Sequence, residues 1–404
     1  MKKKFLLSLI LIFIFCTSTY SATIRFWHSW SNEEASILSS VVAKYEALSG
    51  NKVIMQGIPF GAFQTRFSTM SARGDVADVI VGPPDWLGLF AEQNLIEPLT
   101  SFNGGDTSGF IKEAIAPCYY KGKLYGLPES VRTIVLFYNR KLISIPPANT
   151  REMINKGTAI TDDGEGVYGL VYDRASFYYH IPWITGFGGK IINETNNRPT
   201  FTSKEQIAAL RFLRNLNTGA KKIMPAESTN FEMTMMMFNQ GMAGMMINGN
   251  WVLGDLKKTR LDFGVAKLPV VSETGLPAKP AAGSEIFMMS SKSKQKEAAY
   301  NFIQFITSSD IQSEFVKAGH IPSRDDVYEM KKVRTSGFYN ELQVFKAQLA
   351  DSIPMPNVPE MNYGIWDQGN SMVQELLNTN NSYEDVTRDA QNTAVRRIIQ
   401  SQKK

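Results

Sequence analysis

The chain contains few of the residues that cross-link a fold or bind a metal. Its 404 residues include only two cysteines and three histidines. Cys118 is the single cysteine beyond the first 21 residues, so removal of that segment leaves no pair that could form a disulfide. The histidines, His28, His180 and His320, are far apart and belong to no His-Glu-x-x-His motif. We therefore expect no metal and no cofactor.

The short motifs of nucleotide-binding and hydrolase sites are also missing. The glycine-rich run at 186–189 (Gly-Phe-Gly-Gly) matches neither the dinucleotide fingerprint nor the phosphate loop, and a turn explains it better. The sequence has no Gly-x-Ser-x-Gly nucleophile elbow. Its basic residues are scattered and not interleaved with aromatic ones, which gives no support to nucleic-acid binding.

The first 21 residues have the pattern of a secretory signal peptide. Three lysines at positions 2–4 precede an apolar run from Phe5 to Phe15, which is too short to span a bilayer, and small polar residues follow. We expect cleavage after Ser21 and export to the periplasm, with lipid attachment at Cys16 as an alternative. Removing three of the 43 basic residues leaves 40 against 38 acidic ones, a near-neutral balance that does not favour membrane-surface binding.

The length of the chain favours two domains, because one hydrophobic core rarely grows to this size. A strand over Thr23–Trp27, a helix from Asn32 to about Leu48 and a strand over Lys52–Ile58 form a β-α-β unit, which predicts a parallel sheet with a right-handed crossover. A helix is expected over Phe63–Arg73, and further strands are expected over Val76–Val81, Thr133–Tyr138, Tyr168–Tyr172 and Phe263–Leu268.

The stretch from Gly241 to Trp251 is the most informative single segment. A helical pattern over 231–239 should end at Gly241, and Met242–Ile247 is apolar enough for one buried strand. The Asn-Gly-Asn that follows should break the strand in a tight turn. Trp251 would then lie at the carboxyl end of a strand, where open α/β sheets bind ligands, although a core position explains it equally well.

Aromatic residues are abundant, with 24 Phe, 15 Tyr and 6 Trp. Many lie at predicted strand ends or in turns rather than in the apolar stripe of a helix, and flat rings in such positions can stack on the C–H face of a sugar. The aromatic residues in such places are Trp27, Trp30, Trp86, Tyr178, Tyr179, Trp251, Tyr363 and Trp366.

Paired carboxylates raise the alternative of a glycosidase, which needs two of them on either side of the scissile bond. The candidates are Glu33 with Glu34, Asp85 and Glu129. Glu33 and Glu34 point in different directions on a helix and are better explained as stabilising its N-terminus. Asp85, at a strand end, can accept hydrogen bonds from sugar hydroxyls as readily as it could catalyse.

At these residues the chain resembles the family 1 extracellular solute-binding proteins of ABC importers, and among them the maltose/maltodextrin-binding type. The resemblance covers essentially the whole mature chain, and its segments occur in the order that the family has. They are the opening Thr-Ile-Arg-Phe-Trp-His-Ser-Trp and the segments Asp78–Asp85, Leu136–Arg140, Met245–Trp251, Phe263–Pro269 and Met355–Pro359.

The resemblance implies a two-lobe α/β fold of the periplasmic binding protein type, with a hinge and a mainly parallel sheet in each lobe. The implied boundaries are 22–130 with 283–323 for the N-terminal lobe, and 131–282 with 324–404 for the C-terminal lobe. It implies a monomer that captures a di- or oligosaccharide, delivers it to a membrane permease and catalyses nothing.

The resemblance also implies which side chains contact the ligand. Trp251 and Trp366 match stacking tryptophans, Tyr178 and Tyr179 an aromatic pair, and Asp85 a hydroxyl-binding aspartate. Met355 matches an apolar contact, and the loop containing Trp27, His28 and Trp30 matches a ligand-facing loop.

Four positions depart from that pattern. Gly82 stands where a third stacking tryptophan is usual, and Trp86 replaces a ligand-binding arginine. Arg132 and Ser176 each replace a glutamate. Because arginine suits carboxylate or phosphate, Arg132 leaves open an anionic sugar or glycerol phosphate as the ligand. A binder of an amino sugar, a polyol or a peptide is a further alternative.

Overall fold

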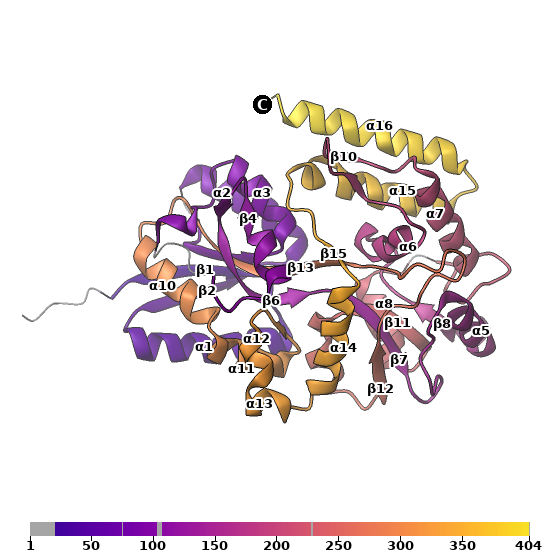
Figure 1. The fold of residues 1–404 in the computed structure, drawn as a ribbon, viewed down its shortest axis with the longest axis horizontal. Helices are drawn as coiled ribbons and strands as arrows, with labels where there is room; N and C mark the ends of the chain where they lie inside the picture. The colour runs from indigo at the N-terminus through magenta and orange to yellow at the C-terminus, as the bar shows by residue number, and fades with distance from the viewer. Residues whose placement is uncertain (1–20, 75, 103–106, 228, 404) are drawn as a thin grey trace, which may run out of the picture.

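The computed structural model describes residues 21–403 apart from 75, 103–106 and 228. Cys16 and all but the last residue of the expected signal peptide therefore lie outside the described residues. The chain forms two α/β lobes side by side, each built on its own sheet (Figure 1). In the part of the chain described, no helix combines the length and the apolar content that a bilayer span requires.

The sheet of the N-terminal lobe has the strand order β14-β6-β13-β3-β1-β2, with β15 beside β13. β1 is parallel to β2 and β3, as the β-α-β pattern predicts, whereas β13 is antiparallel to β3 and β6. These strands are β1 (Thr23–His28), β2 (Lys52–Gly57), β3 (Val79–Gly82), β6 (Gly126–Arg132), β13 (Ala281–Met289), β14 (Ile321–Pro322) and β15 (Ile353–Pro354).

The sheet of the C-terminal lobe has the order β12-β7-β11-β8. β11 is parallel to β8, but β7 is antiparallel to both β11 and β12, so this sheet is more mixed than expected. β7 is apolar along almost its whole length because helices cover both faces of the sheet. The strands are β7 (Ile134–Asn139), β8 (Tyr168–Val171), β11 (Ala243–Gly249) and β12 (Phe263–Ala266).

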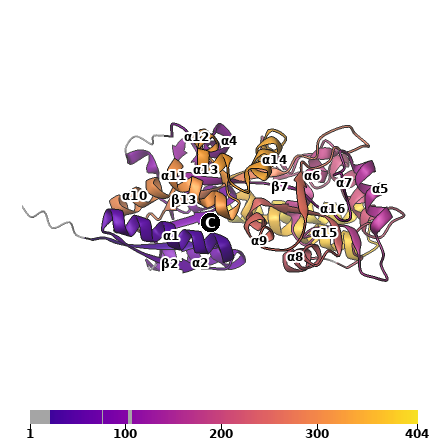
Figure 2. The same cartoon turned by 90° about the horizontal axis from the view of Figure 1, so that it is seen from below.

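Helices cover both sheets, and Figure 2 shows them on either side of the strands. In the first half of the chain they are α1 (Asn32–Ser49), α2 (Phe60–Arg73), α3 (Pro84–Glu92), α4 (Lys112–Ile115), α5 (Thr150–Ile160), α6 (Ile181–Gly186) and α7 (Lys204–Asn217). The second half adds α8 (Phe231–Asn239), α9 (Leu253–Leu256), α10 (Lys296–Ile306), α11 (Ser309–Phe315), α12 (Asp325–Glu329), α13 (Lys331–Arg334), α14 (Tyr339–Ala350), α15 (Trp366–Asn378) and α16 (Tyr383–Ser401).

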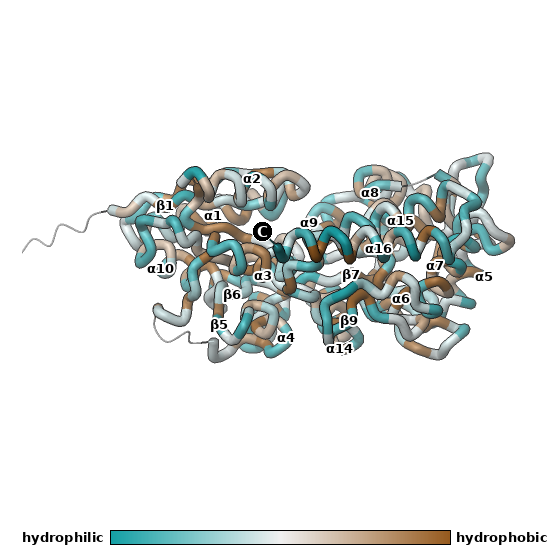
Figure 3. Tube along the Cα trace, turned by 90° about the horizontal axis from the view of Figure 1, so that it is seen from above, coloured by the Kyte–Doolittle hydropathy of each residue, from teal (hydrophilic) through white to brown (hydrophobic). Residues whose placement is uncertain are grey.

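The last helix illustrates how these helices are held. α16 buries Val386, Ala390, Ala394 and Ile398, which recur every four residues and so lie on one face. Its tube alternates between hydrophilic and hydrophobic colours in Figure 3, as a helix with one buried face should.

The chain passes between the lobes through short segments. Thr133 alone separates β6, in the first sheet, from β7, in the second. The chain returns to the first sheet between β12 and β13, and it leaves that sheet for the last time between β15, which pairs with β13, and α15, which packs against α7. α14 packs against β12 and β7 of the second sheet and also against β14 of the first, so it does not belong to one lobe alone. The residue boundaries expected for the two lobes therefore remain a prediction.

Two local differences from the sequence-based expectations affect the site. α2 begins at Phe60, three residues before the predicted start at Phe63. β11 continues through Gly249, whose φ of −99° and ψ of 178° are extended, so the expected turn at 248–250 is wrong. Gly241, with φ of +76°, does end the preceding helix in the left-handed conformation that glycine favours.

Candidate ligand-binding cleft

A cavity of about 1140 Å³ lies between the two lobes. Its walls come from strand ends, from the turns that follow them, and from the first turns of α1, α2, α3, α8 and α15. Nine of the eleven side chains that the sequence singles out line it: Trp30, Asp85, Trp86, Arg132, Tyr178, Tyr179, Trp251, Met355 and Trp366.

Trp27 and His28 do not line this cavity. β1 extends through His28, so both residues lie within the strand and not in a loop. Trp27 is buried against Phe63 and Phe67 at ring distances of 6.3 and 6.4 Å. His28 is buried with its ring 5.7 Å from that of Phe26. Both belong to the core of the N-terminal lobe.

The C-terminal lobe contributes an aromatic wall. Trp251 is only partly buried, and the ring of Tyr178 lies 6.4 Å from it. The Tyr178 hydroxyl donates to the carbonyl of Ala281 (3.1 Å), and the Tyr179 hydroxyl donates to Asn248 Oδ1 (3.2 Å). These bonds fix the two tyrosine rings, so the wall is organised before a ligand arrives.

Gly249 is required by the ring of Trp251. A Cβ atom at position 249 would lie 2.1 Å from that ring, much closer than carbon atoms can approach. The glycine that sequence analysis assigned to a turn therefore provides space for the tryptophan.

We expect Gly249→Ala to weaken ligand binding, because the added methyl group must displace Trp251. The loss should be smaller than that caused by removing the ring altogether. Fluorescence titration of the variant measures the effect, and Gly337→Ala is the control, since nothing lies within 4 Å of a Cβ at that position. Binding equal to that of the unsubstituted protein would show that the ring need not occupy this place.

Asp85 lies across the cleft from Trp366. The Trp366 Nε1–H donates to Asp85 Oδ2 at 3.0 Å, which links the N-terminus of α3 to that of α15. Burial raises the pKa of Asp85 to about 6, and the bond from Trp366 partly opposes this rise. Close to neutral pH the carboxylate is charged and can accept hydrogen bonds from hydroxyl groups.

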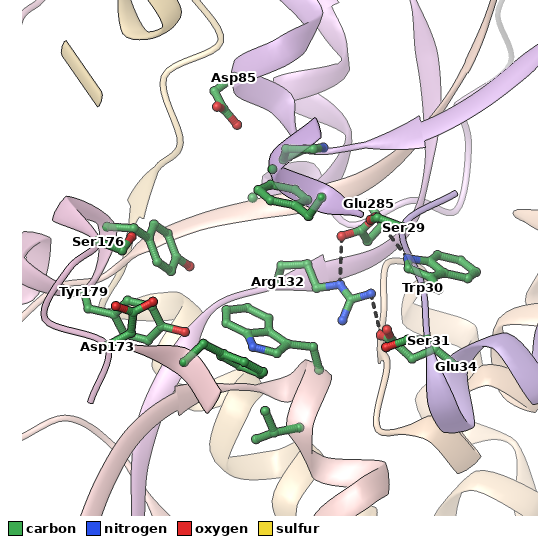
Figure 4. A pocket seen from close by; sticks show the side chains of 18 of the residues that line it. Ser29, Trp30, Ser31, Glu34, Asp85, Arg132, Asp173, Ser176, Tyr179 and Glu285 are labelled. Atoms are coloured by element: carbon green, nitrogen blue, oxygen red, sulfur yellow. Dashed lines mark hydrogen bonds and ion pairs between the residues drawn. The ribbon is translucent and has the colours of Figure 1, made fainter. Parts of the chain in front are cut away.

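Arg132, at the end of β6, is held in a buried network of charges. Its Nη2 lies 2.8 Å from Glu34 Oε1 and its Nε lies 3.2 Å from Glu285 Oε1. His320 extends the network, with Nε2 3.0 Å from Glu34 and Nδ1 2.7 Å from Glu129. Figure 4 shows the guanidinium group between Glu34 and Glu285. The charge of Arg132 is thus largely neutralised by its own neighbours.

The network shifts two pKa values in opposite directions. Burial alone would raise the pKa of Glu34, but Arg132 and His320 together lower it to about 2. Burial alone would lower the pKa of His320, but Glu129 and Glu34 raise it to about 9 despite repulsion from Arg132.

These shifts predict how the network contributes to stability. The contribution of Glu34 is complete above its ordinary pKa of 4.5 and is lost as the pH falls towards 2. That of His320 is complete below its ordinary pKa of 6.5 and is lost as the pH rises through 9. Both are present between about pH 4.5 and 6.5.

Urea unfolding of the native protein and of His320→Gln at several pH values tests this prediction. The stability advantage of the native protein should be greatest near pH 6 and should decrease steadily between pH 6.5 and 9. An advantage that stays constant over that range would mean that His320 is not protonated in the folded state.

The position of Trp86 explains one departure from the family pattern. Its ring fills the space above Gly82, where a Cβ atom would lie 2.5 Å from Trp86 Cε3. Phe60 stacks on Trp86 at 5.1 Å, and Phe63 stacks on it at 5.2 Å. Trp86 is therefore packed into the lobe, whereas Phe60 remains at the cavity. Phe60 is not among the predicted site residues, because the helix was expected to begin only at Phe63.

The cavity is acidic. Among its described lining residues Arg132 is the only cation, and eight carboxylates accompany it: Glu33, Glu34, Asp85, Asp173, Glu232, Asp255, Glu285 and Asp367. The described residues contain no group of three or more His, Cys, Asp or Glu side chains that could hold a metal ion. Asp173 and Glu285 are lining residues that the sequence does not predict, because they lie far from any motif and only the fold brings them to the cavity.

Two α/β lobes that enclose an aromatic and acidic cavity at the carboxyl ends of strands define a periplasmic binding protein-like fold, the class that closes by hinge motion around a ligand. The sequence agrees with this class. The chain belongs to the bacterial extracellular solute-binding protein family, whose sequence profile matches residues 40–337. Members of this family are non-catalytic binding proteins, which confirms the expectation that the chain is not an enzyme.

Individual relatives extend the comparison. A maltotriose-binding protein of Pyrococcus abyssi is 24% identical over 365 residues, which cover 88% of this chain and 78% of the relative. A maltooligosaccharide ABC transporter solute-binding lipoprotein of Streptococcus pneumoniae is 22% identical over 367 residues, 88% of this chain and 84% of the relative.

A solved structure agrees with the fold. The maltose/maltodextrin-binding domain from Bdellovibrio bacteriovorus bound to maltotriose superimposes with a TM-score of 0.84 at 27% identity, covering 93% of this chain and all of that one. The match confirms the predicted fold class and the resemblance to maltose/maltodextrin-binding proteins.

Proposed function

We propose that this protein is the sugar-binding subunit of an ABC importer, and that it captures a neutral malto-oligosaccharide between its lobes and delivers it to a membrane permease. The observation that carries the proposal is the pairing of an aromatic wall with an acidic rim in one inter-lobe cavity. Trp251, Trp366 and Tyr178 offer flat apolar surfaces to sugar rings. Asp85 and its acidic neighbours offer acceptors to sugar hydroxyls.

The similar proteins support the same ligand class. A relative from Pyrococcus abyssi is named for maltotriose, and one from Streptococcus pneumoniae is named for maltooligosaccharides and an ABC transporter. The structural neighbour from Bdellovibrio bacteriovorus contains maltotriose. The cavity, at about 1140 Å³, exceeds the roughly 300–1,000 Å³ usual for small-molecule sites and has room for more than one sugar unit.

The electrostatics of the cavity disfavour an anionic sugar. Arg132, the residue that raised this alternative, is paired with Glu34 and Glu285, and the other lining charges are negative. A phosphate group would meet a surplus of carboxylates and would lose its hydration shell. Arg132 Nη1 makes no hydrogen bond within the described part of the chain, but the atom is buried and presents no accessible charge to an anion.

A fluorescence screen discriminates between these ligand classes. The four tryptophans that line the cavity among the described residues, Trp30, Trp86, Trp251 and Trp366, should report binding of maltose and longer malto-oligosaccharides. Glucose phosphate and glycerol phosphate should leave the spectrum unchanged at the same concentrations. A response to the phosphates without a response to any neutral saccharide would overturn the proposed ligand class.

Export completes the proposed function. The N-terminal 21 residues would direct the chain across the cytoplasmic membrane, and the protein would act in the periplasm, free or anchored by a lipid on Cys16. The intact mass of the exported protein distinguishes the two forms, because cleavage after Ser21 removes Cys16 whereas lipidation retains it and adds acyl chains.

A further inference from the structure

Phe60 combines two properties that no other aromatic residue of the N-terminal lobe shares among those described. It lines the inter-lobe cavity, and its side chain is 58% exposed. Trp30 and Trp86 also line the cavity, but they are only 5% and 4% exposed. Phe60 is therefore the aromatic group that this lobe presents to a ligand.

The packing of Phe60 leaves one face of its ring available. The other face stacks on Trp86, with the ring centroids 5.1 Å apart and the planes inclined by 27°. Trp86 is held in turn by Phe63, at 5.2 Å and 28°. Because Trp86 also contacts the core residue Phe90, at 6.1 Å and a tilt of 58°, the ring of Phe60 has a rigid support. A sugar can stack on a ring that is held in place and has one free face. Because the side chain is already fixed, it loses little conformational entropy on binding.

The first turn of α2 is held close to the opposite lobe. Gln64, one turn after Phe60, donates through Nε2 to Asn362 Oδ1 at 2.8 Å, and Asn362 in turn donates to the backbone carbonyl of Asp85. In Figures 2 and 3, α2 and α8 lie on the same side of the molecule, one in each lobe. Phe231, the first residue of α8, lines the cavity from that second lobe.

The separation of Phe60 from the C-terminal aromatic wall gives it a distinct role. None of the ring contacts of Phe60 in the described chain involves Trp251, Trp366 or Tyr178, which belong to the other lobe. A short saccharide can rest on that wall alone. A longer one would extend beyond that wall, and the exposed ring of Phe60 is a further flat surface of the same cavity.

We propose that Phe60 is a stacking platform for a sugar unit at the end of a longer oligosaccharide, and that it makes the protein discriminate between ligands by chain length. The proposal rests on the proposed function, since it concerns the same cavity and the same class of ligand. It also explains why residue 82 is a glycine, because a side chain there would displace Trp86 and remove the support of Phe60.

Calorimetric titration of Phe60→Ala with maltose and with maltopentaose tests the proposal. The dissociation constant for maltopentaose should rise ~10-fold, the effect of losing about 1.4 kcal/mol of stacking, whereas that for maltose should change less than ~2-fold. Phe60→Tyr keeps the ring and should restore the affinity for maltopentaose. Leu48→Ala is the matched control, because Leu48 is 71% exposed on α1 and does not line the cavity.

Equal weakening for both sugars would overturn the proposal, because it would mean that Phe60 acts by holding Trp86 and not by contacting a terminal unit. Unchanged affinity for both sugars would overturn it as well. If the unsubstituted protein bound no malto-oligosaccharide, the proposed function itself would fail, and this result is distinguishable because it appears before any substitution is made.

Discussion

Replacing Arg132 by methionine is expected to lower the free energy of unfolding by about 3–5 kcal/mol, the range typical when one partner of a buried ion pair is removed. The side chain is buried and lies between two carboxylates, at 2.8 Å from Glu34 and 3.2 Å from Glu285. Without it Glu285 would lose its ion-pair partner, and Glu34 would keep only His320, at 3.0 Å. Urea unfolding at pH 7 measures the change.

Two further variants separate burial from charge. Arg140→Met removes an arginine that pairs with Asp262 at 2.8 Å, but both of these side chains are exposed, so the change should be below about 1 kcal/mol. The triple variant Arg132→Met, Glu34→Gln, Glu285→Gln removes the unpaired charges and should regain most of the lost stability. Equal losses of unfolding free energy for Arg132→Met and Arg140→Met would show that the buried charge network does not stabilise the fold.

Replacing Trp251 by alanine is expected to weaken binding of maltotriose by about 1–3 kcal/mol, as truncation of an aromatic anchor does at other interfaces. Trp251 is partly buried beside Tyr178 and lies two residues beyond Gly249, the last residue of β11. The free energy of unfolding should change less than the binding energy, because the ring lines the cavity and is not fully buried.

Calorimetry on Trp251→Ala and Trp251→Phe measures this effect. The phenylalanine variant keeps a smaller flat surface and should bind with intermediate affinity. If affinity were unchanged in the alanine variant while stability fell, Trp251 would be a core residue, and the ligand would not stack on its ring.

The sequence predicts well those features that depend on local pattern. The unit β1-α1-β2 follows from apolar spacing and from a stop at Gly50, which adopts the left-handed conformation. Trp251 is placed correctly at the end of a buried strand, because Met245 and Ile247 mark that strand by their continuous apolar character.

Features that depend on where a strand ends are predicted less well. His28 looked like a loop residue because the polar sequence after it resembles a turn, and the family resemblance added Trp27 to that loop, yet the backbone stays extended through His28. Alternation in a strand then directs the side chains to the two packed faces of the sheet. Phe60 was missed for the related reason that a helix can begin directly after Pro59 without a polar capping side chain.

Features that depend on long-range contacts have no sequence signal at all. Arg132 meets Glu34 across 98 positions and His320 across 188, and no spacing rule connects them. From the sequence alone Arg132 therefore suggested an anionic ligand. In the fold its partners neutralise it, and the same residue becomes consistent with a neutral saccharide.

The central claim is that the inter-lobe cavity binds a neutral malto-oligosaccharide. Calorimetric titration of the mature protein with maltotriose tests it most directly, with the double variant Trp251→Ala, Trp366→Ala as the control for the site. We predict saturable heat with one ligand per chain for the native protein and no detectable heat for the double variant. No saturable heat with the native protein, or equal affinity in the double variant, would contradict the account.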